Sequence, residues 1–168
     1  MKETLRKINS LVTCGIIEKY AIAGGIAHFF YIEPSVTFDL DLIVTVTTEK
    51  NTLTPLSEIY KWSKENNLKT EGEHIIISGV PVQFLLPYND LVVEALEKRL
   101  EITLFNEKTF ILGPEYLMAI MLQTGRATDR ERLTRFFSEA EFNEEVFKDM
   151  VARFKLSEKL SDFRKIYE

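Results

Sequence analysis

The sequence predicts an α/β (α+β) fold, in which helices flank a mixed, twisted sheet and the C-terminal part is helical. Up to residue 112, short apolar runs typical of strands alternate with stretches that have helical periodicity. From Gly113-Pro114 onward, apolar residues recur only at helical spacing. No Pro- or Ser-rich linker separates the two parts. We therefore expect one compact unit, with a sheet domain at 1–112 and a helical lobe at 113–168.

The first part of the chain is predicted to begin with a helix over its first twelve residues, followed by a buried strand at 20–23 that ends at Gly24-Gly25. A short helix is expected at 26–31. The clearest strand is 39–46, because it is rich in β-branched residues. Thr54 and Pro55 predict the next helix start, with Thr54 as N-cap and Pro55 at the first helical position.

Further elements follow in the same alternation. Up to residue 112 we expect strands 74–77 and 80–86, helix 89–100, and strands 101–105 and 109–112 around a turn at Asn106-Glu107. The helical lobe is expected to contain helices at 115–123, 128–139, 143–154 and from 157 onward.

The composition excludes several classes of protein. The chain has 168 residues, of which 45% are hydrophobic and 28% charged, so it can bury a core without cross-links. The single cysteine, Cys14, excludes a disulfide framework and a thiolate metal cluster. A net charge of −5 argues against a broad electrostatic grip on nucleic acid, although a local basic site is still possible.

No apolar stretch approaches the roughly 20 residues that cross a bilayer, and the N-terminus lacks the apolar centre of a signal peptide. We expect a cytoplasmic protein without a membrane partner.

Asp39 and Asp41 stand two residues apart at the start of the clearest strand. Strand geometry puts both carboxylates on one face, with Cα atoms about 7 Å apart. Because like charges repel, this arrangement favours a divalent cation between them, and Mg²⁺ binds carboxylates together with substrate phosphates. The alternative is that the strand begins at an exposed sheet edge, where water solvates both side chains.

Gly24 and Gly25 precede the expected helix start at Ile26. Free backbone N–H groups at a helix N-terminus favour anions, and glycine lets a phosphate come close. A Gly-Gly pair alone is also typical of a plain tight turn. The order of strand, Gly-Gly, short helix and Asp-x-Asp strand is far more specific than either motif.

These motifs resemble the polymerase-β-type nucleotidyltransferase superfamily, and within it the minimal nucleotidyltransferases related to abortive-infection toxins. The similarity is carried by Ala-Gly-Gly-Ile-Ala at 23–27 and Thr-Phe-Asp-Leu-Asp-Leu at 37–42. Gly-Pro-Glu-Tyr-Leu at 113–117 and Thr-Gly-Arg-Ala-Thr-Asp-Arg at 124–130 are similar to the family's C-terminal helical motif. The resemblance extends from about residue 18 to about residue 137.

The resemblance implies transfer of a nucleoside monophosphate from an NTP to a hydroxyl group, with Mg²⁺ as cofactor. The residues that it implies are Asp39, Asp41 and Asp129 as catalytic, with Asp39 and Asp41 as metal ligands, and Gly24, Gly25, Thr37 and Arg126 as nucleotide-binding. The acceptor is left open, and an RNA end, a protein hydroxyl and a small alcohol all qualify. The toxin relationship implies a protein antitoxin as a further partner.

Three positions depart from the family pattern and support a second hypothesis. The third carboxylate, which the superfamily carries on a neighbouring strand, corresponds to Gln83, and an amide is neither a base nor a strong Mg²⁺ ligand. Ser35 replaces a frequent basic residue, and Met121 replaces a frequent lysine. The second hypothesis is a protein of this fold that binds a nucleotide or a protein partner without turnover.

Four arginines close together in the C-terminal part have two interpretations: Arg126, Arg130, Arg132 and Arg135. They could form a phosphate clamp, or they could lie on an exposed helix face with acidic partners. Thr128-Asp129-Arg130-Glu131 also fits a capping box. His28 could approach a nucleotide but is more typical of a packed helix residue, and His74 is expected to be structural.

Overall fold

A mixed sheet forms the centre of the protein, as expected. The structure is a computed structural model and describes residues 1–33, 39–47 and 54–167. In these ranges seven strands follow the order β3-β4-β5-β2-β1-β7-β6. Their bounds are β1 Ile17–Ala23, β2 Leu40–Val46, β3 Thr70–Glu71, β4 His74–Ile77, β5 Val80–Leu85, β6 Leu100–Leu104 and β7 Glu107–Ile111.

The strand with the Asp-x-Asp motif, β2, lies inside the sheet. It pairs antiparallel with β1 and parallel with β5, so its backbone is hydrogen-bonded on both sides. Leu40, Leu42 and Val44 are fully buried on one face of this strand. The alternative of an exposed sheet edge is therefore wrong.

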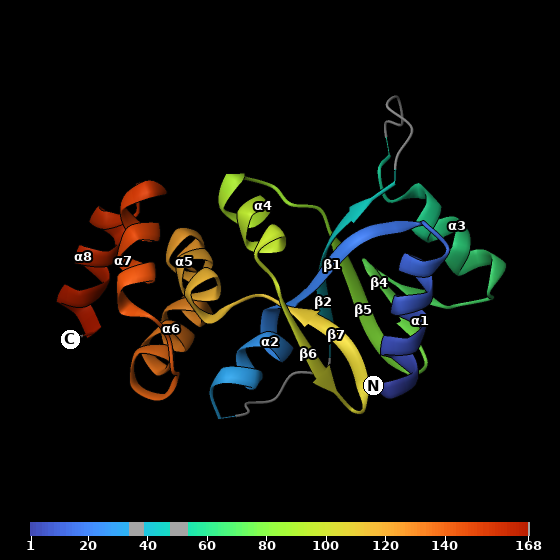
Figure 1. Ribbon diagram of the computed structural model, residues 1–168, viewed down its shortest axis with the longest axis horizontal. Helices are drawn as coiled ribbons and strands as arrows, with labels where there is room; N and C mark the ends of the chain where they lie inside the picture. Colours follow the sequence, from blue (N-terminus) through green and yellow to red (C-terminus); the bar gives the residue numbers. More distant parts are fainter. Residues whose placement is uncertain (34–38, 48–53, 168) are drawn as a thin grey trace.

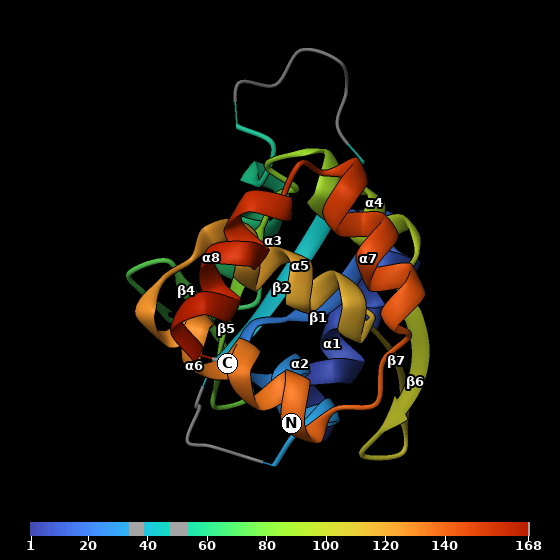
Figure 2. The ribbon, with the colours of Figure 1, turned by 90° about the vertical axis from the view of Figure 1, so that its left-hand side faces the viewer.

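Helices cover both faces of the sheet and continue into the C-terminal part. Their bounds are α1 Lys2–Thr13, α2 Gly24–Tyr31, α3 Ser57–Glu65, α4 Asp90–Glu97, α5 Pro114–Thr124, α6 Ala127–Glu139, α7 Glu144–Arg153 and α8 Ser157–Tyr167. In Figure 1, α1 and α3 lie on one side of the sheet, and α2 and α4 lie on the other, towards α5–α8. Figure 2, viewed from the helical end, shows α5–α8 in front of the strands. None of the helices in the described ranges is long and apolar enough to span a membrane.

Several boundaries differ from the sequence-based expectation. The strand expected at 20–23 begins at Ile17, and the helix expected from Ile26 begins at Gly24, so both glycines belong to its first turn.

Two further differences have local reasons. The helix after Pro55 begins at Ser57, because Ser57 N first closes a turn onto Thr54 O at 3.0 Å; Thr54 is therefore not its N-cap. The hairpin turn between β6 and β7 is Phe105-Asn106, not Asn106-Glu107. Both residues have positive φ, 53° and 61°, as a two-residue hairpin loop requires.

An ion pair connects the C-terminal helices to α4. Arg153 in α7 donates two hydrogen bonds to the carboxylate of Glu94, at 2.8 and 2.9 Å. Tyr116 in α5 donates a third, at 2.7 Å. The hydrogen bonds from Arg153, against a smaller opposing effect of burial and with help from Tyr116, lower the pKa of Glu94 to about 2. One carboxylate therefore joins three helices.

We expect Arg153→Met to destabilise the protein measurably at pH 7, since it removes the bidentate pair with Glu94 as well as the pair with Asp149 on the same helix. The lowered pKa of Glu94 means that this stability is present above about pH 4.5 and is lost as the pH falls towards 2. Urea denaturation at several pH values measures it. Lys148→Met on the same helix, which removes an exposed pair with Glu144, is the control and should change stability by under about 0.5 kcal/mol. Equal effects of the two substitutions would contradict the assigned role of Arg153.

Candidate active site

A cleft of about 710 Å³ lies where β1, β2 and β5 face α2, α4, α5 and α6. This volume is in the range of small-molecule sites. All six expected site residues that the structure describes line the cleft: Gly24, Gly25, Asp39, Asp41, Arg126 and Asp129. Thr37 and Ser35 lie outside the described residues. Segments more than 100 residues apart in the chain therefore meet in one place.

Gly24 and Asp41 occupy one shared space. The chain leaves β1 at Ala23, which pairs with Asp41 across the sheet, and Gly24 turns it into α2 with φ of +58°. A Cβ atom at Gly24 would lie 1.9 Å from Asp41 Oδ2. No real contact is that short, so the carboxylate needs the space that the missing side chain leaves. The Gly-Gly motif and the Asp-x-Asp motif are thus one structural unit.

The two carboxylates repel each other at the floor of the cleft. Asp41 is half-buried, and burial raises its pKa, with a further increase from the charge of Asp39. His74, Arg132 and Arg126 act in the opposite direction. His74 lies on β4, and its Nε2 is 3.9 Å from Asp39 Oδ2. A cation between the carboxylates would relieve this repulsion.

The donor set fits Mg²⁺ bound together with a substrate. Asp39 and Asp41 supply hard oxygen ligands, which Mg²⁺ prefers. Among residues 1–33, 39–47 and 54–167, no group of three or more His, Cys, Asp or Glu side chains could hold a metal ion. The remaining ligands would have to be water and phosphate oxygens, which is the usual mode for Mg²⁺ in nucleotide sites.

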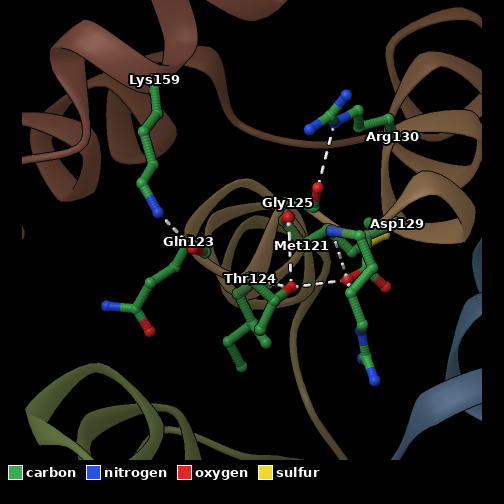
Figure 3. Close-up of polar contacts among 9 residues, drawn as sticks. Met121, Gln123, Thr124, Gly125, Asp129, Arg130 and Lys159 are labelled. Carbon is green, nitrogen blue, oxygen red and sulfur yellow. Dashed lines mark hydrogen bonds and ion pairs between the residues drawn. The ribbon is translucent and has the colours of Figure 1, made fainter.

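Asp129 holds Arg126 at the rim of the cleft. Asp129 is only 2% exposed. Its Oδ2 accepts a hydrogen bond from Thr124 Oγ1 at 2.6 Å (Figure 3) and another from Arg126 Nε at 2.8 Å. Burial alone would raise the pKa of Asp129, but the hydrogen bonds from Arg126 and Thr124 lower it below its usual value. The backbone N–H of Arg126 also donates to Oδ2, at 3.3 Å, so Arg126 precedes the helix and the expected capping box at Thr128 is wrong.

The four clustered arginines divide into two groups. Arg126 and Arg132 line the cleft. Arg130 donates to Gly125 O at 3.0 Å and so caps the end of α5 (Figure 3), and Arg135 binds Glu139 at 2.8 Å. The side chain of Arg126 is 73% exposed, and apart from its bonds to Asp129 it makes no side-chain hydrogen bond within the described ranges. Its Nη groups are therefore available for an anion.

Two residues of the cleft were missed or underrated by the sequence analysis. His28, four positions after Gly24, is 4% exposed, and its buried Nδ1 has no hydrogen-bond partner among the residues that the structure describes. Burial, with a contribution from Arg132, lowers the pKa of His28 to about 4, so the ring is neutral at pH 7. Tyr88 lies just before α4, and its side chain is exposed on the cleft wall. Tyr88 stands in no motif and in no periodic apolar pattern, so no sequence signal points to it.

We expect Gly24→Ala to destabilise the fold and displace Asp41. The substitution combines a positive φ, which is unfavourable by about 1–2 kcal/mol for an L-residue, with overpacking of about 1–3 kcal/mol. Gly15→Ala is a matched control, because Gly15 has φ of +78° but nothing within 4 Å of its Cβ position. Urea denaturation of both variants isolates the clash. Equal losses of stability would show that Asp41 does not depend on the space at Gly24.

We expect Asp41→Asn to stabilise the protein without ligand. Since the pKa of Asp41 is raised in the folded state, folding stability should fall as the pH rises from about 4 through that pKa and stay lower at pH 7. Removing the charge should raise Tm at pH 7 by about 2–4 °C, the shift that about 1 kcal/mol produces in a chain of this size. Thermal denaturation checks this, with Asp162→Asn on the exposed face of α8 as control. A variant that melts below wild type at pH 7 would contradict the repulsion described above.

Comparison with known proteins supports the fold. No family model and no curated protein matches the sequence. A solved structure described as an antigenic nucleotidyltransferase-like protein from Paracoccidioides brasiliensis matches with a TM-score of 0.57 and 17% sequence identity. The match covers 98% of this chain and 93% of that chain. The chain thus has a nucleotidyltransferase-like fold over nearly its whole length.

Proposed function

We propose that the protein is a minimal nucleotidyltransferase, which transfers a nucleoside monophosphate from an NTP to a hydroxyl group with Mg²⁺. The observation that carries the proposal is the contact of Asp41 with Gly24 on the floor of a cleft that also contains Asp39 and Arg126. Such a reaction needs a glycine turn that leaves room for a phosphate, and a pair of carboxylates that can bind a metal ion. They adjoin each other here.

The residues of the cleft divide the work of phosphate binding. Asp39 and Asp41 would hold Mg²⁺, which neutralises phosphate charge and polarises the transferred group when it is bound. The start of α2 at Gly24 and Gly25 offers backbone N–H groups to phosphate oxygens. Arg126 and Arg132 add positive charge on the opposite wall. Reactions of this type depend mainly on positioning and charge neutralisation, so a small site suffices.

Two further side chains support substrate binding from less direct positions. Asp129 accepts bonds from Thr124 and Arg126, so we assign it the role of positioning Arg126 rather than the catalytic role implied by the resemblance. The exposed ring of Tyr88 on the cleft wall is suited to stack against a base.

The second candidate function is nucleotide binding without turnover. Gln83 supports it, because this amide is the direct neighbour of Asp41 on β5. Met121 supports it as well, since it puts a buried thioether on the cleft wall where the resemblance implies a lysine. Neither residue can take a proton from an acceptor hydroxyl.

The test is incubation with radiolabelled NTPs, Mg²⁺ and three acceptor classes: total tRNA, protein and small alcohols. The wild type should release pyrophosphate and transfer label to one class. Asp39→Asn and Asp41→Asn should reduce transfer by about 10²–10³-fold, the typical loss when a main electrostatic contact with the transition state is removed. Asp162→Asn should have no effect.

Calorimetry with Mg·NTP separates the outcomes. Binding that is lost in Asp41→Asn, with no transfer by the wild type to any acceptor, would replace the enzyme by the second candidate. Absence of both binding and transfer would contradict both functions.

A further inference from the structure

Three strands present a row of side chains beside Asp41. Gln83 on β5 is the partner of Asp41 in the parallel pair, and His74 on β4 is the partner of Gln83 in the antiparallel pair. Directly paired residues on adjacent strands point to the same face of a sheet. The position next to Asp41, where the resemblance implies a third carboxylate, therefore holds the amide of Gln83.

A carboxylate contacts this amide from outside the row. Glu73 lies in the turn between β3 and β4, and its Oε2 accepts a hydrogen bond from Gln83 Nε2 at 2.7 Å. A carboxylate at this distance can only accept, so the NH₂ group of the amide must face Glu73. The carbonyl oxygen, Oε1, is then the group that Gln83 has left for the cleft, which it lines.

We propose that Glu73 and Gln83 together replace the third carboxylate of the site. Glu73 fixes the amide, and Gln83 offers Oε1 as a neutral oxygen ligand for the cation held by Asp39 and Asp41. This inference rests on the proposed function and deepens it. Glu73 is a positioning residue, since its bond to an amide N–H is charge-assisted and increases the negative partial charge on Oε1.

The electrostatics of the cleft favour this arrangement over a third acid. Asp39 and Asp41 stand two residues apart and both line the cleft, so the two carboxylates repel each other when no metal lies between them. A carboxylate in place of Gln83 would add a third charge in the same row. Glu73 instead lies in an exposed turn, where water screens its charge.

Mn²⁺ with a non-hydrolysable ATP analogue is the probe, measured by electron paramagnetic resonance of bound Mn²⁺, which does not depend on turnover. Glu73→Ala should weaken Mn²⁺ binding by about tenfold, the usual effect of removing a residue that orients a metal ligand. Glu73→Gln keeps a hydrogen-bonding side chain and should lose less. Glu71→Ala on the same hairpin, which removes an exposed pair with Lys69, should bind Mn²⁺ as wild type does.

A charge exchange gives an effect of opposite sign. The double variant Glu73→Gln/Gln83→Glu keeps the hydrogen bond with donor and acceptor reversed, and it moves the negative charge next to Asp41. We expect tighter Mn²⁺ binding than in wild type and a lower Tm without metal, because repulsion in the row increases. Circular dichroism confirms that each variant is folded.

The outcomes distinguish a failure of the role of Glu73 and Gln83 from a failure of the proposed function. Wild-type Mn²⁺ affinity in Glu73→Ala, together with no gain in the double variant, would overturn the role of Glu73 and Gln83 while leaving the proposed function in place. Equal Mn²⁺ affinity in wild type and Asp41→Asn would overturn the proposed function itself.

Discussion

The site depends on the fit of one carboxylate into the space left by one absent side chain. Asp41 Oδ2 lies 1.9 Å from the place that a Cβ at Gly24 would take, and the chain turns from β1 into α2 at Gly24 with a positive φ. Both the direction of α2 and the place of the carboxylate follow from this contact. The helix that could receive phosphates and the strand that could hold a metal therefore adjoin each other at this point.

The position of Asp41 lowers the folding stability of the protein. Half-burying Asp41 beside Asp39 is unfavourable for the fold, as the raised pKa of Asp41 shows. The positive charges of Arg126 and Arg132 offset only part of this repulsion. Part of the charge of Arg126 is in turn neutralised by its hydrogen-bonded partner Asp129. Sites that hold like charges close together for a ligand are commonly less stable than the same fold without them.

Local motifs predicted much of the fold and the core of the site, whereas long-range contacts decided the rest. Gly24, Gly25, Asp39 and Asp41 could be found because their spacing carries the chemistry. The residues of β2 alone do not show whether the strand lies inside the sheet or at its edge. Its position is decided by the backbone hydrogen bonds that β1 and β5 make with its two edges. The contact of Glu73 with Gln83 crosses from a hairpin turn to a strand and has no sequence signature.

Packing also decided which charged and aromatic side chains belong to the site. Arg132 and Arg135 look equivalent in sequence, yet one lines the cleft and the other pairs with Glu139. The pKa of His28 is lowered by burial and by Arg132, and its ring packs against Phe136 of α6 with 5.6 Å between ring centres. Helical periodicity predicts that such residues are on a helix but not what the helix faces.

The most direct measurement of the central claim is a crystal structure with Mn²⁺ and a non-hydrolysable NTP, using anomalous scattering to locate the metal. We expect a Mn²⁺ peak in contact with carboxylate oxygens of both Asp39 and Asp41, with the triphosphate between the start of α2 and Arg126. A nucleotide bound in this cleft without metal at Asp41, or a metal and nucleotide bound elsewhere on the protein, would contradict it.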